Sequence, residues 1–416
     1  MGLQLCQLCE IAYFVTDKIP LENVLLTDYV TTDSLLPNKE GRCVAQNLPP
    51  QKCALTHYKC GDVLVANIRP YLKKIWFADR EGGASADVLV FRAKSGHSQE
   101  FLYALLLQDT FYDYVMKGKK GSKMPRGDRD QIMRYYIPKL SLAEEACIGN
   151  MILSFCTKVN VNRLINDNLE AMAKQLYDYW FVQFDFPNEE GKPYKSSGGA
   201  MVWNEKLKRE IPVGWSVKNL GQIATSYQQG LIRSNNQLST DSKYGYLKMG
   251  DLDGKGQYTL QGLTRTNATN EEVDLYSLHK GDFLINVRNS KEIVGKTCLI
   301  GYVERNTLYN HMLVRLDFKD VSTFYMNLLF NSEFMYKALD GLKQGTTTVI
   351  ALYQSDLYRL PILIPAPCVM ERFLKITDSI LDQKEIISHE IAELTKQRNE
   401  LLPLLMNGQA TVNYHL

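Results

Sequence analysis

The chain has 416 residues, of which 45% are hydrophobic and 23% charged, and its formal net charge is only +2. This length exceeds one ordinary core and predicts two domains, while the near-neutral charge gives no overall sign of a nucleic-acid binder. No apolar run approaches the roughly 20 residues of a membrane helix, and the nine cysteines form no disulfide-like framework. We therefore expect a cytoplasmic protein without a membrane segment.

Residues 1–140 predict a first globular unit of mixed α/β structure. The expected strands cover residues 29–33, 63–69, 86–91 and 134–138, and the expected helix covers 101–116. Residues 111–139 hold eight Lys or Arg against three Asp, an excess suited to phosphate contacts. The alternative for this one run is a solvated loop.

Residues 141–186 predict a long amphipathic helix. Residues 150–186 contain neither Pro nor Gly, and apolar side chains recur at spacings of three, four or their sums. These apolar positions include Ile148, Met151, Phe155, Ile165, Leu169, Met172 and Leu176. Thirty-odd helical residues reach on the order of 50 Å, further than an ordinary domain is wide, so this helix is a spacer or a partner-binding rod.

Residues 187–366 predict a connector followed by a second globular unit, and residues 367–410 predict a second long helix. The connector is rich in Gly, Pro, Ser and Lys, and we expect a hinge-like loop there. The second helix has the same apolar spacing as the first, with charged residues on its other face. Its apolar positions include Phe373, Ile376, Ile380, Ile387, Ile391, Leu394, Leu401 and Leu405.

The two halves of the chain repeat one plan. A Gly-Asp pair before an apolar run occurs at Gly61 and again 220 residues later at Gly281. An Ile-Pro pair before a long helix occurs at Ile137 and again 227 residues later at Ile364. The separation drifts slowly and the order of elements never changes, which indicates an internal pseudo-two-fold repeat of an α/β unit followed by a long helix.

The sequence offers no catalytic constellation. There is no GxxxxGK[ST] loop for nucleotide phosphates, no methyltransferase nucleotide pocket, and the six histidines show no metal-ligand spacing. Cys6 and Cys9 form a CxxC pair, but a zinc site needs a second pair of ligands, which the sequence lacks. We therefore expect a chain that recognises a target and is not itself an enzyme, with no cofactor or metal of its own.

Two recognition units held apart by rods suit an extended, roughly two-fold target, and DNA is such a target. Candidate contacts are Arg, Lys, Asn and Gln for base edges, and Lys, Ser and Thr for phosphates, on turns of both units. The candidates in the first unit are Asn67, Arg69, Tyr71, Lys73, Lys74, Lys119, Lys120, Ser122, Lys123 and Arg126. Those in the second unit are Arg233, Asn235, Lys248, Arg288, Asn289, Lys291, Lys343, Gln344, Thr346 and Thr347.

One run in the middle of the chain carries a specific family resemblance. It reads WFVQFDFPN over 180–188, GKPYKSSGG over 191–199 and IPVGW over 211–215. This run resembles the central conserved region of the DNA-specificity subunits of type I restriction-modification systems. The repeated Gly-Asp starts and the Ile-Pro-then-helix endings are similar to that family too, so the resemblance covers essentially the whole chain.

The resemblance implies a non-catalytic subunit with two target-recognition domains that read a bipartite site in double-stranded DNA. It also implies two antiparallel, coiled-coil-like helices, over 141–186 and 367–410, that separate the domains and dock two methyltransferase subunits. Restriction or translocase subunits can join such a complex. S-adenosylmethionine, ATP and magnesium would then be used by the partner subunits.

Two other functions are compatible with parts of the sequence. A coiled-coil adaptor whose α/β units bind proteins would need the long helices but no DNA contacts. A self-sufficient nuclease or methylase would need catalytic motifs, which the sequence does not contain. Sequence-selective, salt-dependent DNA binding discriminates the specificity subunit from the adaptor.

Overall fold

The computed structural model describes residues 4–51, 53–121, 124–254, 256–260, 263–345 and 350–411. The candidate contacts Ser122, Lys123, Thr346 and Thr347 lie outside these residues. The chain forms two compact units, unit 1 (Met1–Leu164 with Glu390–Leu416) and unit 2 (Ile165–His389). Within the described ranges, no helix is both long enough and apolar enough to cross a membrane.

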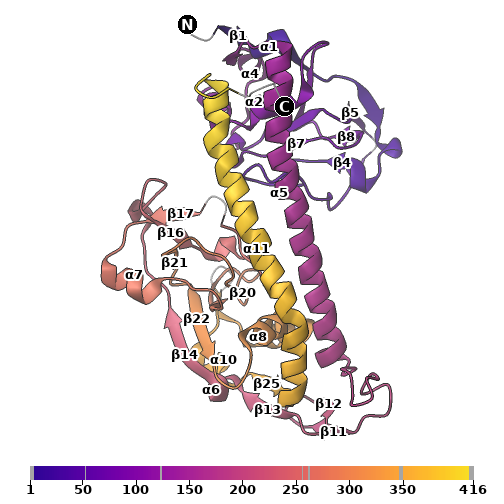
Figure 1. Cartoon of the computed structure of the whole chain (residues 1–416), viewed down its shortest axis with the longest axis vertical. Helices are drawn as coiled ribbons and strands as arrows, with labels where there is room; N and C mark the ends of the chain where they lie inside the picture. The colour runs from indigo at the N-terminus through magenta and orange to yellow at the C-terminus, as the bar shows by residue number, and fades with distance from the viewer. Residues whose placement is uncertain are drawn as a thin grey trace. The chain divides into compact units, whose positions relative to one another are not determined.

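Unit 1 combines a central four-stranded antiparallel sheet, a second four-stranded sheet and a helical layer (Figure 1). Its strands are β1 (Leu5–Gln7), β2 (Ala12–Phe14), β3 (Lys18–Pro20), β4 (Tyr29–Val30), β5 (Ala54–Tyr58), β6 (Val63–Ala66), β7 (Ile75–Phe77), β8 (Gly82–Ala84), β9 (Val88–Ala93) and β10 (Tyr136–Pro138). Its short helices are α1 (Leu8–Ile11), η1 (Leu21–Asn23), η2 (Leu26–Asp28), η3 (Pro70–Leu72), α2 (Gln99–Leu107), α3 (Asp109–Lys117) and α4 (Arg129–Met133).

The central sheet of unit 1 has the order β2-β9-β6-β7, and both of its faces are covered. Val63 and Val65 of β6 belong to the core shared with α2 and α3, whereas Leu64 and Ala66 belong to a separate core shared with the second sheet. Alternate side chains of a strand point to opposite faces, so burial of both faces explains the uninterrupted apolar run.

Unit 2 repeats this layering. Its strands are β11 (Met201–Asn204), β12 (Arg209–Pro212), β13 (Ser216–Asn219), β14 (Ala224–Gln229), β15 (Leu238–Ser239), β16 (Tyr244–Leu247), β17 (Thr264–Thr266), β18 (Phe283–Asn286), β19 (Arg288–Asn289), β20 (Thr297–Leu299), β21 (Leu308–Tyr309), β22 (Leu313–Phe318), β23 (Gln344–Gly345), β24 (Ile350–Ala351) and β25 (Pro361–Ile364). Its shorter helices are η4 (Asp178–Val182), α6 (Leu220–Ile223), η5 (Asn235–Gln237), η6 (Met249–Asp251), α7 (Asn270–Tyr276), α8 (Thr323–Phe330), α9 (Glu333–Leu342) and α10 (Gln354–Leu357).

The order of the central sheet in unit 2 is β14-β22-β18-β20, which matches β2-β9-β6-β7 strand for strand. The entry strands match as well, because β1 pairs with β10 and β13 pairs with β25, both antiparallel. The second sheets differ in one neighbour: β5 pairs with β8 in unit 1, whereas its counterpart β17 pairs with β16 in unit 2. The repeat seen in the sequence is therefore a repeat of strand pairing.

The helix expected over residues 101–116 is two helices in the structure, α2 and α3. Gln108 interrupts them with an extended backbone (φ −67°, ψ 144°). The counterparts α8 and α9 are separate too, and a serine hydroxyl, that of Ser322 or Ser332, caps each of them.

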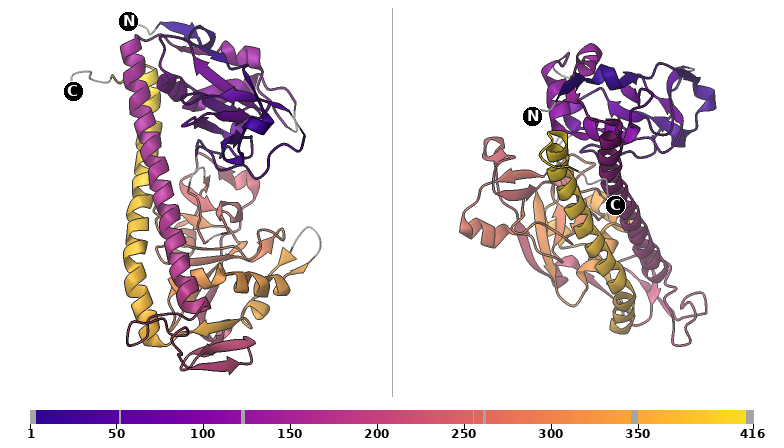
Figure 2. Two further views of the ribbon diagram at one scale, coloured as in Figure 1. Left: turned by 90° about the vertical axis from the view of Figure 1, so that its right-hand side faces the viewer. Right: turned by 45° about the horizontal axis from the view of Figure 1, so that its top comes forward.

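The two long helices are α5 (Leu142–Tyr177, 36 residues) and α11 (Pro367–Met406, 40 residues). Both views of Figure 2 draw each of them as one continuous helix. The first was expected over 141–186, but a π-helical segment over residues 178–182 follows Tyr177, and Phe184 has a positive φ of 64°. This change of winding buries Trp180, Phe181 and Phe184 in the core of unit 2.

Segments of both long helices pair antiparallel inside each unit. In unit 1, Asn162 of α5 donates a hydrogen bond of 2.8 Å to Glu390 of α11, and the Lys158 ammonium lies 3.3 Å from the same carboxylate. In unit 2, Asn166 donates to Ser388 at 3.3 Å, and Glu170 pairs with Lys384. Residues of increasing number in α5 thus contact residues of decreasing number in α11, which shows that the paired segments run antiparallel.

The connector after α5 is folded, in contrast to the expected hinge-like loop. Strands β11 and β12 form an antiparallel hairpin, and the Phe186 ring stacks on Tyr194 and on Trp215, with centroids 4.6 Å and 5.3 Å away. Aromatic residues at both ends of the connector anchor it to the core of unit 2. The glycines and polar residues of this segment therefore form turns of an ordered structure.

Candidate nucleic-acid interface

The repeated Gly-Asp pair has a structural role in both units. The Asp62 carboxylate is fully buried, accepts a hydrogen bond of 2.7 Å from the backbone N–H of Lys59, and binds the Arg92 guanidinium through two further bonds of 2.7 Å. In unit 2, Asp282 accepts 2.9 Å from the His279 N–H and lies 3.2 Å from Arg315. The carboxylate closes the turn that begins β6 or β18 and ties it to the neighbouring strand.

The residues after β6 and β18 meet a second segment that comes from much later in the chain. In unit 1, Ile68 bridges to Arg126, and Arg126 exchanges two backbone hydrogen bonds with Lys120, at 2.9 and 3.0 Å. Arg69 adds a backbone bond of 2.8 Å to Pro125. We call the backbone-paired set Ile68, Arg69, Lys120 and Arg126 clasp 1.

Unit 2 has the same arrangement as a three-stranded sheet with the order β19-β24-β23. Arg288 pairs with Ala351, and Ala351 pairs with Gln344. The backbone bond from Gly127 to Asn67 in unit 1 has its counterpart in the bond from Leu352 to Val287 in unit 2. We call the set Arg288, Asn289, Gln344 and Ala351 clasp 2.

Backbone register makes the positions of the two clasps equivalent. Ile68 corresponds to Arg288, Arg69 to Asn289, Lys120 to Gln344 and Arg126 to Ala351. All eight positions are surface-accessible to some degree. The structure thus brings together candidate residues from two distant stretches of sequence, and it does so twice.

Not every candidate of unit 1 presents its polar group at this surface. Arg69, Tyr71, Lys119, Lys120 and Arg126 are exposed.

Three others hold their polar groups against or inside unit 1. The Lys73 ammonium lies 2.8 Å from the Asp109 carboxylate, and Lys74 donates 2.5 Å to the backbone carbonyl of Thr32. The side-chain oxygen of Asn67 is buried, without a hydrogen-bond partner among the described residues.

The candidates of unit 2 divide in the same way. Arg288 and Gln344 are exposed at clasp 2, beside the half-buried Asn289, and Gln344 donates 2.9 Å to Asp356. Lys291 and Lys343 lie 4.0 and 3.1 Å from Asp340.

The remaining candidates of unit 2 lie elsewhere in the unit. Arg233 binds Glu272 through two bonds of 3.1 and 2.7 Å, and only 9% of its side chain is exposed. Lys248 donates 2.9 Å to Thr264, while Asn235 is exposed on η5.

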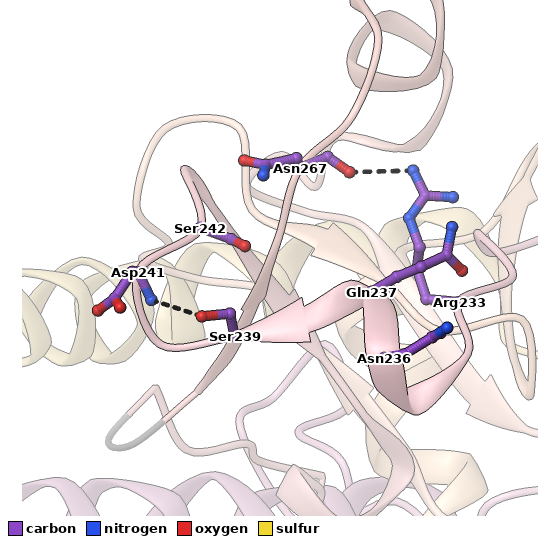
Figure 3. Close-up of a pocket in the computed structure, with 7 residues that line it drawn as sticks. All are labelled: Arg233, Asn236, Gln237, Ser239, Asp241, Ser242 and Asn267. Atoms are coloured by element: carbon purple, nitrogen blue, oxygen red, sulfur yellow. Dashed lines mark hydrogen bonds between the residues drawn. The ribbon is translucent and has the colours of Figure 1, made fainter.

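A polar hollow of about 510 Å³ lies beside η5 and β15 in unit 2 (Figure 3). Its lining residues are Arg233, Asn236, Gln237, Ser239, Asp241, Ser242 and Asn267. The Arg233 guanidinium turns toward the backbone carbonyl of Asn267, at 3.1 Å, and Glu272 neutralises its charge. Because the lining also includes the Asp241 carboxylate, the hollow does not suit a phosphate.

Charge pairing sets the electrostatics of clasp 1. Lys120 lies 2.6 Å from Asp128, and this hydrogen-bonded pair raises the pKa of Lys120 and lowers that of Asp128. Arg126 lies 3.1 Å from Asp87. In unit 2, burial and the nearby Arg288 charge lower the pKa of His311.

The sequence did not single out Asp87, Asp128 or His311 as parts of these surfaces. Asp128 lay inside the basic run, where the excess of lysine and arginine masked it. The repeat implies that Asp87 has an equivalent position in unit 2, but only the backbone pairing identifies that position as Met312.

Among the described residues, no group of three or more His, Cys, Asp or Glu side chains could hold a metal ion. Cys6 of the CxxC pair lies in the core of unit 1, where burial raises the pKa of its thiol. The geometry thus offers two equivalent, solvent-accessible surfaces on paired strand ends, suited to binding.

Comparison with known proteins agrees with such a chain. The family described as type I restriction modification DNA specificity domain matches residues 212–396. The MjaIX type I restriction enzyme specificity subunit of Methanocaldococcus jannaschii is 24% identical over 77% of this chain and 71% of its own length. The HindI specificity subunit of Haemophilus influenzae is 22% identical over 92% of this chain and 94% of its own.

The chain is thus similar to type I restriction enzyme specificity subunits over most of its length. Its fold is similar to that of the type I S subunit from M. genitalium, with a TM-score of 0.54 at 12% identity, over 98% of this chain and 96% of that one. This similarity confirms the prediction of a non-catalytic specificity subunit and disfavours the adaptor.

Proposed function

We propose that this specificity subunit reads a bipartite site in double-stranded DNA, with one half-site for each unit. The observation that carries the proposal is the repeated clasp: each unit presents, on paired strand ends, polar side chains drawn from two distant stretches. Strand ends hold such side chains more firmly than free loops do, which suits readout of base edges.

The exposed cations of clasp 1 and its surroundings, Arg69, Lys119, Lys120 and Arg126, suit phosphate contacts, and the amides Asn289 and Gln344 of clasp 2 suit base edges. The candidates Ser122, Lys123, Thr346 and Thr347 belong to the same two stretches of sequence. Lys73, Lys74 and Arg233 have less to offer, because they are less exposed and bond to partners within their own units.

The long helices then have two tasks in the proposal. They act as the spacer between the recognition units, packed as an antiparallel coiled-coil-like pair, and they dock two methyltransferase subunits. The antiparallel contacts inside each unit and several exposed apolar side chains on the helices, such as Leu164, Met172 and Ile386, support this. Restriction or translocase subunits would join the same complex, and S-adenosylmethionine, ATP and magnesium would serve those partners.

Gel-shift measurement on the chain assembled with its methyltransferase subunits tests DNA recognition. The target is first identified by mapping methylated sites in a host that carries the complex. Tight binding to that site, falling steeply with salt, is the expected result, since each neutralised phosphate adds about −0.9 to the slope of log K against log salt. Binding that ignores both sequence and salt would leave the adaptor as the better explanation.

Alanine substitution of Lys119, Lys120 and Lys123 separates phosphate contacts from base readout. We expect weaker binding to every sequence and a shallower salt slope, with the recognised bases unchanged. The matched variant is Gln344→Ala in clasp 2, which should relax one half-site only. A changed target sequence in the lysine variant, at an unaltered slope, would contradict the assignment.

The spacer role has its own test. Seven residues inserted into each helix, after Leu164 and after His389, lie at the boundaries between the two units. Seven helical residues add about 10 Å, roughly three base pairs at 3.4 Å each. Methylation mapping should then find the same half-sites with about three more base pairs between them, whereas unchanged spacing would limit the helices to partner binding.

A further inference from the structure

Two acidic residues hold the cations of clasp 1. The Arg126 guanidinium lies 3.1 Å from the Asp87 carboxylate, and the Lys120 ammonium lies 2.6 Å from Asp128. Both cations are largely exposed, with 55% and 75% of their side chains accessible. Two of the four exposed cations that suit phosphate contacts are thus already paired within unit 1.

The equivalent positions of unit 2 lack both members of each pair. The backbone carbonyl of Asp87 accepts a hydrogen bond from the Asn67 N–H, and the backbone carbonyl of Met312 accepts the corresponding bond from the Val287 N–H. Arg126 and Asp87 are therefore replaced by Ala351 and Met312.

The second pair shows the same joint change. Asp128 is the N-cap of α4, and Tyr353 is the N-cap of α10. Each directly follows the residue, Gly127 or Leu352, whose backbone N–H donates to the residue after β6 or β18. Lys120 and Asp128 are replaced by Gln344 and Tyr353. A cation and its acid are thus present together in one unit and absent together in the other.

The clasp does not need these acids in order to form. Clasp 2 has the same backbone pairing with neutral residues at both acidic positions. Asp128 also caps α4 by accepting from the N–H groups of Asp130 and Gln131, but it does so with Oδ1, whereas Lys120 contacts Oδ2. Asparagine caps a helix about as well as aspartate, so the charge and the cap are separable.

We propose that Asp87 and Asp128 are specificity-setting residues: they compete with DNA phosphates for Arg126 and Lys120 and so suppress binding of unit 1 to non-cognate DNA. The proposal rests on the proposed function, because it concerns the same DNA surface. Unit 2 has neutral residues at the two equivalent acidic positions, and the acid beside its clasp, Asp356, accepts from the uncharged Gln344 amide. Discrimination against wrong sequences then comes partly from this built-in competition, a repulsive element that adds to base contacts.

The magnitudes favour a restraint that can be overcome. Exposed ion pairs contribute little net stability, so a well-placed phosphate displaces the carboxylate at little cost. Removal of one acid leaves one more unpaired cation and one repulsive charge fewer. If that cation gains one phosphate contact, the salt slope steepens by about 0.9, and affinity at 50 mM salt rises by roughly three- to tenfold.

The test measures non-cognate affinity of the chain assembled with its methyltransferase subunits, using a fluorescent duplex of arbitrary sequence over a series of salt concentrations. The variants are Asp87→Asn and Asp128→Asn. The control is Glu81→Gln, which removes an exposed acid of unit 1 that pairs with His57 outside the clasp. A further variant combines Asp87→Asn with Arg126→Ala.

We expect each asparagine variant to bind the arbitrary duplex about three- to tenfold more tightly with a steeper salt slope, and the Arg126→Ala combination to abolish the gain. Affinity for the mapped site should rise less, so the ratio of specific to non-specific affinity falls. Unchanged non-cognate binding, or an equal gain for Glu81→Gln, would overturn the proposal while leaving DNA recognition intact. Failure of the unaltered complex to bind its mapped site would instead overturn the proposed function.

Discussion

The buried Asp62 carboxylate provides the most direct test of how unit 1 is held together. Asp62→Asn removes the charge that faces Arg92 and leaves the guanidinium, only 16% exposed, without its main partner. The remaining acid, Asp17, is 3.8 Å away and well exposed. Loss of one member of a buried ion pair costs about 3–5 kcal/mol, and we expect the lower end of that range because Asp17 and solvent compensate in part.

The equivalent change in unit 2 should cost less. Arg315 lies 3.2 Å from Asp282, but it also donates 3.0 Å to the Ser277 carbonyl and 2.5 Å to the Gln228 side chain. Asp282→Asn therefore leaves the guanidinium with other acceptors. We expect about 1.5–2 kcal/mol, the lower part of the range for loss of a hydrogen bond to a charged group.

Hydrogen exchange of backbone amides measures the two units separately, which a single melting curve of a two-unit chain does not. Protection of β6 and β9 should fall by about 3 kcal/mol in Asp62→Asn, and protection of β18 and β22 by less in Asp282→Asn. Replacing Asp62 and Arg92 together by Leu and Met should restore most of the loss. Equal losses in the two units, or a loss below about 1 kcal/mol for Asp62→Asn, would refute the reasoning.

Three further predictions concern single positions. Gly82→Ala should destabilise unit 1 by about 1–3 kcal/mol in hydrogen exchange, because the added Cβ would lie 2.2 Å from the backbone oxygen of Asp28. The pKa of His311 in the folded chain should lie below 6.5 and rise in Arg288→Gln, as NMR titration can measure. Since the unfolded chain then binds the proton more readily, stability of unit 2 should fall as pH drops through 6.5 toward the folded pKa, and an unshifted titration would contradict this. Ser98→Ala should cost about 1 kcal/mol of α2 stability through the lost N-cap, whereas Ser98→Asn should be near neutral, and equal exchange rates would contradict the capping role.

Sequence reasoning located the strands that carry strong local signals. The apolar runs after Gly61 and Gly281 form β6 and β18, and the Ile-Pro pairs end β10 and β25 before the long helices. It missed the break at Gln108, since nothing in the apolar spacing of this stretch marks the change to an extended backbone. The π-helical turn after Tyr177 was also missed. It accompanies the burial of aromatic side chains in the core of unit 2, and this tertiary packing is not visible in the apolar spacing of the sequence.

The candidate surface was predictable only in part, because charge is local in sequence and pairing is not. Lys73 appeared to be an accessible cation until Asp109, 36 residues later, was found beside it. Arg233 meets Glu272 across 39 residues in the same way. Conversely, residues near 68 and near 126 were identified separately, and only the backbone pairing of the clasp shows that they form one surface.

The division of the chain into units also constrains the order in which the protein can fold during synthesis. The core of unit 1 includes Leu402, Leu405 and Met406 of α11, yet all of unit 2, residues 165–389, is synthesised before them. At about 5–20 residues per second, translation of that interval takes on the order of 10–50 s. During this time the apolar side chains of unit 1 that will contact α11 stay exposed to solvent, whereas unit 2 can complete its core first. The half of the molecule that begins the chain is therefore the last to be finished, and it is the half most in need of protection from aggregation while the ribosome is still at work.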